Sequence, residues 1–156
     1  MASVYIETSI VSYLTARASR DLVIAAHCQI TQEWWEMRRD AFDLYTAQPV
    51  IKEASAGDPE MVAKRLAVLD GIPLLMVNQV ANDLAKTLVT RGPIPPKAAI
   101  DALHIATATV HSMDYLLTWN CKHIANAEMQ HAIAKRCHAA GFKMPVLCTP
   151  EELSGS

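Results

Sequence analysis

The 156-residue sequence has no segment typical of a linker, a leader or a membrane span. No Gly/Ser-rich or charge-rich stretch divides it, so we expect a single domain over residues 1–156. No apolar run approaches the roughly 20 residues that a membrane-spanning helix needs. The amino terminus lacks the basic start and long apolar stretch of a signal peptide, and Glu7 follows its few apolar residues closely. We therefore expect a cytoplasmic protein that enters no membrane.

Paired cysteines and an excess of positive charge are also missing. The four cysteines contain no CxxC pair, which favours reduced thiols over disulfides in a cytosolic chain. Cys121 with His123, and Cys137 with His138, fit the spacing of no common zinc finger or ribbon. The formal net charge of −2 argues against a broadly basic nucleic-acid-binding surface, but it leaves open one whose contacts are local or metal-mediated.

What the sequence does contain is an alternation of strand-like and helix-like segments. Hydrophobic residues make up 51% and charged residues 19%, as in a compact protein with buried strands. Alternating strands and helices predict an α/β fold with a mainly parallel sheet covered on both faces. The expected strands are 4–6, 42–46, 72–77, 115–118 and 145–148, and the expected helices are 10–14, 21–39, 48–54, 58–71, 78–92, 98–111 and 126–141, with a final helical turn at 149–152.

Polar residues and prolines mark several helix starts. Asp58 followed by Pro59, and Asn78 at the next helix, predict N-caps. Thr8 or Ser9 is expected to cap the first helix. The stretch 149–152 has the form of a capping box.

One carboxylate, Asp101, lies in the almost wholly apolar helical run 98–108. The prolines of 93–96 suit the approach to a helix and its first turn. Asp101 then lies about one turn into the helix, where the positive end of the helix dipole favours negative charge. Because a buried or half-buried Asp is costly unless it is paired, hydrogen-bonded or bound to a cation, Asp101 is either capped locally or binds something.

Three more oxygen-bearing side chains are expected at the same edge of the sheet. Glu7 follows the first strand, Glu53 the second and Asn120 the fourth, and the carboxyl ends of parallel strands border the crevice where α/β proteins bind ligands. Converging carboxylates repel one another, and a divalent cation relieves that repulsion. Mg²⁺ and similar hard ions prefer such oxygens and bring phosphate groups with them, so the pattern suggests phosphodiester hydrolysis. An exposed acid at a helix start remains the structural alternative for Glu7.

Four segments together resemble the successive motifs of a PIN domain. They are Tyr5–Ser9, Val50–Glu53, Asp101–Ala108 and Leu116–Asn120, and the DALHIATA stretch with the LLT strand after it is the most specific part. Within that family, these segments resemble those of VapC-like toxins of type II toxin–antitoxin systems. The resemblance implies a three-layer α/β/α sandwich on a parallel five-stranded sheet of order 3-2-1-4-5. It also implies Mg²⁺- or Mn²⁺-dependent endoribonuclease activity with a 5′-phosphate product, a homodimer and an antitoxin partner.

By position, the resemblance assigns the metal site and catalysis to Glu7, Glu53, Asp101 and Asn120. Glu7 stands where the family has an Asp, so its carboxylate is one methylene further from the backbone. Asn120 stands where many members have a fourth acid, which weakens a second metal position and makes a one-metal site or reduced activity plausible. Another group, such as Asn126, is a candidate to compensate for the neutral Asn120.

Thr8 and Thr118 are expected to orient ligands from behind the site, with helix capping and strand-end hydrogen bonding as their structural alternatives. Arg17, Arg20 and Lys97 are candidates for RNA contact by charge and position, and simple solvation or a surface ion pair is the alternative. His104 shares a helix face with Asp101, and we interpret it as a core residue.

The sequence thus favours a metal-dependent endoribonuclease, the toxin of a toxin–antitoxin pair. The alternative is a catalytically weak or inactive PIN module that binds RNA or a protein partner. A DNA-directed flap-type nuclease is less favoured, because the chain shows no extra helical insertions for threading a strand.

Overall fold

Five parallel strands form one sheet in the computed structural model, which describes residues 1–155. The spatial order is β3-β2-β1-β4-β5, which confirms the order that the PIN resemblance implied. All four neighbouring pairs are parallel, and β1 lies at the centre, with Tyr5 in register with Tyr45 on one side and Leu116 on the other. The strands are β1 (Ser3–Ile6), β2 (Asp43–Ala47), β3 (Leu74–Leu75), β4 (Tyr115–Leu117) and β5 (Val146–Cys148).

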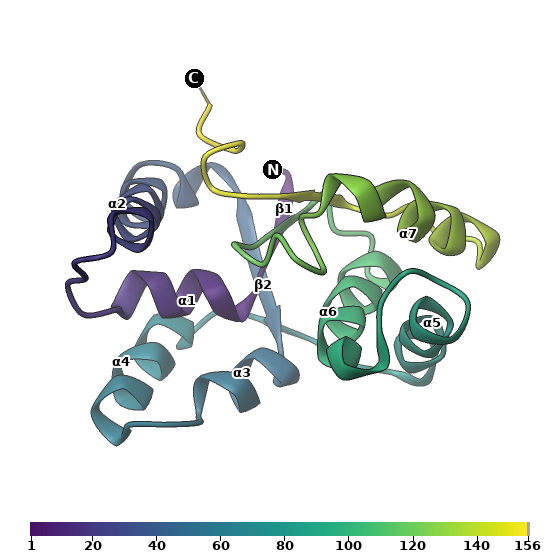
Figure 1. The fold of residues 1–156 in the computed structure, drawn as a ribbon, viewed down its shortest axis with the longest axis horizontal. Coiled ribbons are helices and arrows are strands. Elements are labelled where there is room, and N and C mark those ends of the chain that lie inside the picture. The colour runs from purple at the N-terminus through teal and green to yellow at the C-terminus, as the bar shows by residue number, and fades with distance from the viewer. Residues whose placement is uncertain (156) are drawn as a thin grey trace.

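Helices cover both faces of this sheet, and Figure 1 shows one group of them on one side and a second group on the other. The first group follows β1 and β2, and the second group precedes and follows β4. Right-handed crossovers produce this division, because the chain steps outward from β1 to β3 in one direction and then returns past β1 to β4 and β5. The first group is α1 (Thr8–Thr15), α2 (Leu22–Met37), α3 (Gln48–Ala54) and α4 (Pro59–Leu69), and the second is α5 (Gln79–Thr90), α6 (Ala99–Val110) and α7 (Ala127–Ala139).

The core lies on both faces of the central strands. Val4, Tyr5 and Ile6 of β1 are fully buried, and so are Leu116 and Leu117 of β4. Burial on both faces explains why these strands are continuous apolar runs rather than alternating ones. The helix α6 contributes the matching apolar surface, with most of its residues buried.

The predicted N-caps of the later helices are confirmed, but that of the first helix is wrong. Asp58 accepts the backbone N–H of Met61 at 3.1 Å, and Asn78 caps α5 in the same way. In α1, however, Thr8 is already the first helical residue, and Glu7 stands at the N-cap without a side-chain capping bond. The hydroxyls of Thr8 and Ser9 donate to carboxylates instead, as described below.

One of two expected features near the sheet edges is shorter than expected, and the other is present. The strand expected over 72–77 contains only Leu74 and Leu75, because Pro73 has no N–H and the N–H of Ile72 bonds back to the Leu69 carbonyl. The capping box at 149–152 is present, with the Thr149 N–H donating to Glu152 Oε1 at 2.9 Å. Beyond it the chain runs across to α2 (Figure 1), where the indole of Trp34 donates to the Leu153 carbonyl.

None of the helices in residues 1–155 combines the length and the apolar character needed to cross a membrane.

Candidate metal centre

The expected site residues lie at the carboxyl edge of the sheet. Glu7 directly follows β1, and Thr118 directly follows β4. The strands β1 and β4 are parallel neighbours in the sheet. Glu53 lies in α3, which begins directly after β2. Asp101 lies in the first turn of α6.

Glu7 is an almost fully buried carboxylate, only 5% exposed. Its Oε1 accepts hydrogen bonds from Ser9 Oγ and Thr118 Oγ1, both at 2.5 Å. Each of these hydroxyls in turn accepts a backbone N–H, Ser9 from Trp119 at 2.8 Å and Thr118 from Asn120 at 2.9 Å. The backbone donors direct the hydroxyl protons toward the carboxylate, which offsets the cost of burying its charge.

Glu53 is held in a similar way. Its Oε1 accepts the Thr8 hydroxyl at 2.6 Å and lies 2.6 Å from His104 Nε2. Burial raises the pKa of Glu53, but the hydrogen bonds from His104 and Thr8 outweigh it, and the net shift of the pKa is downward. Glu53 is therefore ionised at neutral pH.

Glu7, Glu53 and His104 form the one close group of potential metal ligands within residues 1–155. Each offers a ligand atom, and these atoms lie within 4.8 Å of one another. Within the same residues, the side-chain hydrogen bonds of both carboxylates all end on Oε1, which leaves each Oε2 without one. Two carboxylates held this close, each with one oxygen unused, fit a divalent cation such as Mg²⁺ or Mn²⁺.

Asp101 is not part of that close group. Its Oδ2 lies 3.2 Å from Nδ1 of His123, and both side chains are largely buried. The backbone N–H of His123 donates to Asn120 Oδ1 at 3.0 Å, so the carboxamide of Asn120 shapes the turn that brings His123 to Asp101. His123 is one of the site residues that sequence reasoning missed, because nothing in a spacing of 22 residues indicates this contact.

His104 has two roles where the sequence suggested one. It is fully buried, as expected of a core residue. Its ring nevertheless bridges Glu53 and Tyr5, whose hydroxyl lies 2.7 Å from Nδ1. The shared helix face with Asp101 was the one sequence signal that placed His104 near the site.

The loop after β4 is held by an aromatic cluster of Tyr13, His27 and Trp119. The rings of His27 and Trp119 are stacked with centroids 3.9 Å apart, and Tyr13 meets both edge to face. The indole N–H of Trp119 donates to Thr31 Oγ1 at 2.7 Å. These contacts tie the loop to α1 and α2 and so fix Thr118, one residue earlier.

The three candidate RNA-contacting residues differ in whether they form ion pairs. Arg17 already pairs with Asp58 at 3.4 Å and with Glu60 at 4.0 Å. Arg20 and Lys97 are exposed and form no ion pair within residues 1–155. Arg20 and Lys97 are therefore the freer cations.

Asn126 does not make up for the neutral Asn120. Its Oδ1 accepts the backbone N–H groups of Glu128 and Met129, so it serves as the N-cap of α7.

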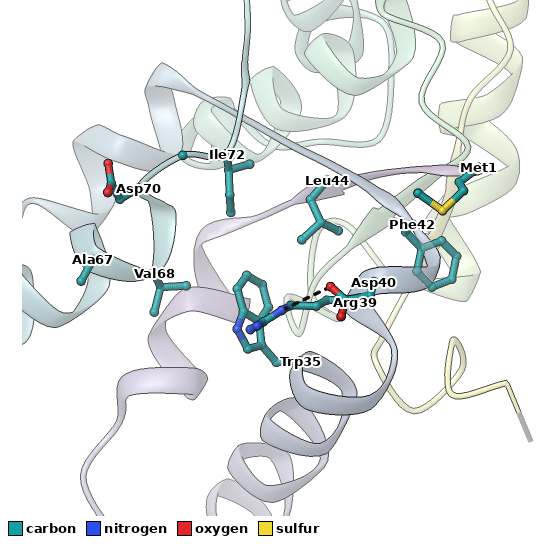
Figure 2. A pocket seen from close by; sticks show the side chains of 11 residues that line it. Met1, Trp35, Arg39, Asp40, Phe42, Leu44, Ala67, Val68, Asp70 and Ile72 are labelled. Carbon is teal, nitrogen blue, oxygen red and sulfur yellow. Dashed lines mark ion pairs between the residues drawn. The ribbon is translucent and has the colours of Figure 1, made fainter.

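Two of the surface pockets could admit a ligand, and they differ in whether the expected site residues line them. A groove of about 720 Å³ beside Glu53 has an apolar lining that includes Ile51, Ile100 and Leu103 from α3 and α6. Figure 2 shows a different pocket, of about 560 Å³, near the start of β2, where Arg39 lies over the Trp35 ring. The second pocket contains none of the expected site residues, so the carboxyl edge remains the candidate site.

Comparison with solved structures finds chains of the same fold. VapC20 of Mycobacterium tuberculosis, a toxin that cleaves the sarcin–ricin loop, is 15% identical, with 89% of this chain and 95% of that chain covered at a TM-score of 0.59. VapBC2 of Rickettsia felis, solved bound to a DNA fragment from its promoter, is 14% identical. The match covers 94% of this chain and 98% of that chain at a TM-score of 0.59. Scans against protein-family models and against curated protein sequences find no match. The chain thus has the α/β/α fold of VapC PIN structures.

Proposed function

We propose that this protein is a metal-dependent endoribonuclease of the PIN type, the toxin of a toxin–antitoxin pair. The observation that carries the proposal is the pair Glu7 and Glu53, two carboxylates fixed by hydroxyl donors with an unused oxygen each. The pair lies at the edge where α/β sheets bind ligands. The shared fold with VapC20, a toxin that cleaves RNA at the sarcin–ricin loop, supports the choice of substrate.

In this proposal Glu7 and Glu53 hold Mg²⁺ or Mn²⁺, and Asp101 and Asn120 complete the site from α6 and the loop after β4. A cation bound there lowers the pKa of a water molecule and neutralises charge on the scissile phosphate. Thr118 keeps the Glu7 carboxylate in place through the hydrogen bond described above.

Thr8 holds Glu53 in the same manner. The substrate's phosphate backbone contacts Arg20 and Lys97, and Arg17 where its ion pairs allow. His123 keeps the carboxylate of Asp101 oriented from the side of the turn.

The proposal extends to partners and location. A protein antitoxin blocks the site, as the paired VapB and VapC components of the Rickettsia felis structure suggest. The chain works in the cytoplasm as a single-domain protomer of a homodimer.

Cleavage of a mixed RNA pool tests the activity. The purified protein is incubated with RNA and Mn²⁺ or Mg²⁺, alongside a reaction with EDTA and reactions with Asp101→Asn and Asp70→Asn. Asp70 is an exposed acid at the end of α4, away from the site, and serves as the matched control. We expect metal-dependent cleavage by the wild type and by Asp70→Asn, and none by Asp101→Asn or with EDTA.

The alternative is a binding module with a weakened metal site, and the neutral Asn120 favours it. A wild-type protein that binds RNA but leaves it intact with every metal supports this alternative and refutes the nuclease.

A further inference from the structure

A buried chain of hydrogen bonds runs from the central strand to the candidate metal centre. The Tyr5 hydroxyl lies 2.7 Å from Nδ1 of His104, and Nε2 of the same ring lies 2.6 Å from Glu53 Oε1. Tyr5 and His104 are both fully buried, and their rings meet edge to face with centroids 5.8 Å apart. No water therefore competes for either ring nitrogen.

The ionised Glu53 carboxylate fixes the position of one ring proton of His104, and the second position follows for the neutral ring. An ionised carboxylate only accepts hydrogen bonds, so the nitrogen that faces Glu53 carries a proton. A neutral imidazole then has its lone pair on Nδ1, which accepts from the Tyr5 hydroxyl. The Tyr5 hydroxyl lies within hydrogen-bond distance of that nitrogen and has a proton to donate.

We propose that Tyr5 and His104 are positioning residues, which hold Glu53 so that it offers Oε2 alone to the cation. The proposal rests on the proposed function, because it concerns how that site holds its ion. His104 Nε2–H and the Thr8 hydroxyl together occupy Oε1. His104 is then a donor to a ligand and not a ligand itself, although its nitrogen lies in the close group.

The arrangement at Glu7 supports this assignment. There too, two donors, Ser9 and Thr118, occupy Oε1. Both carboxylates thus present one free oxygen, which is how hydrogen-bonded ligand carboxylates are commonly fixed. Ligation by His104 would instead require its proton on Nδ1 and the loss of its bond to Glu53.

The proton positions are measured in the ion-free protein. Long-range ¹H–¹⁵N correlation spectra of the histidine-labelled protein report which ring nitrogen of His104 carries hydrogen, and a His104→Gln spectrum assigns the signal. We expect protonated Nε2 and unprotonated Nδ1. A proton on Nδ1 with a bare Nε2 would overturn the proposal.

The second measurement is Mn²⁺ binding by calorimetry to the wild type, Tyr5→Phe and Tyr45→Phe. Tyr45 is the strand neighbour of Tyr5 on β2 and is the matched control. We expect Tyr5→Phe to keep its fold by circular dichroism but to bind Mn²⁺ about 10- to 100-fold more weakly, the usual cost of losing such a support, and Tyr45→Phe to bind as the wild type. Equal affinities for all three would overturn the proposal and leave the metal site standing.

Pulsed electron spin resonance of the Mn²⁺-loaded wild type shows whether a histidine nitrogen binds the ion. A spectrum without histidine nitrogen coupling supports the proposal. A coupling that His104→Gln removes would show that His104 is a ligand, which refutes the positioning role but not the nuclease. A wild type that binds no Mn²⁺ would refute the proposed function, and the positioning role with it.

Discussion

Glu7→Gln tests whether the buried carboxylate is there for the fold or for a cation. The substitution keeps an oxygen that accepts the Ser9 and Thr118 hydroxyls, removes the charge and replaces the other carboxylate oxygen by an NH₂ group. Its effect on the free energy of unfolding has two opposing parts.

The first part is relief of repulsion. Two unit charges no more than 4.8 Å apart, as the ligand atoms are here, repel by at least about 3.5 kcal/mol at an effective dielectric constant of about 20. Because the Glu53 side chain is 38% exposed, solvent screens part of this, and we take the gain as about 1–2 kcal/mol. The second part is weaker hydrogen bonding, about 1 kcal/mol for each hydroxyl that now donates to a neutral oxygen.

The two parts nearly cancel, so in EDTA we expect Glu7→Gln to unfold within about 1 kcal/mol of the wild type. Mn²⁺ at 100 times its dissociation constant should then stabilise the wild type by about 2.7 kcal/mol and the variant hardly at all. Urea unfolding with EDTA and with Mn²⁺ measures both quantities, with Glu36→Gln on the exposed side of α2 as control. Equal stabilisation of Glu7→Gln by Mn²⁺, or a loss above about 3 kcal/mol in EDTA, would refute the reasoning.

Three further predictions concern Thr118, Glu53 and Arg20. Thr118→Val removes a donor to the Glu7 carboxylate, and chemical denaturation should show a loss of about 2 kcal/mol; an unchanged stability would mean that the bond contributes nothing. Because hydrogen bonding holds the pKa of folded Glu53 below its ordinary value of about 4.5, Glu53 stabilises the fold above that pH, and the contribution is lost as the pH falls through the folded pKa. Unfolding curves from about pH 7 to pH 3 should therefore fall less steeply for Glu53→Gln, and identical slopes would contradict this. Arg20→Ala should weaken RNA binding and lower the slope of log affinity against log salt by about 0.7 to 1, which filter binding at several salt concentrations measures, and an unchanged slope would exclude a phosphate contact.

Local sequence signals predicted most of the fold. Asp58 and Asn78 cap their helices through contacts three residues away, so the residues that decide these starts lie within one turn. The buried strands 4–6 and 115–118 were visible as short apolar runs, because both faces of the sheet are covered. The strand order came from the PIN resemblance, and the structure confirms it.

The hydrogen bonds that connect the site residues could not be predicted from the sequence. Thr8 was expected to orient a ligand or to cap the first helix, but the sequence did not indicate its partner, Glu53, which lies 45 residues away and comes within reach once α3 lies beside α1. The contact of His123 with Asp101 depends on a turn that the Asn120 side chain closes. Such contacts depend on how distant elements pack, which neither periodicity nor spacing records.

The most direct test of the central claim is the position of a bound cation, measured by anomalous diffraction from crystals grown with Mn²⁺. The account predicts a manganese peak between the carboxylates of Glu7 and Glu53, in contact with Oε2 of each. An ion that binds elsewhere and touches neither carboxylate, or a site that stays empty at saturating Mn²⁺, would contradict it.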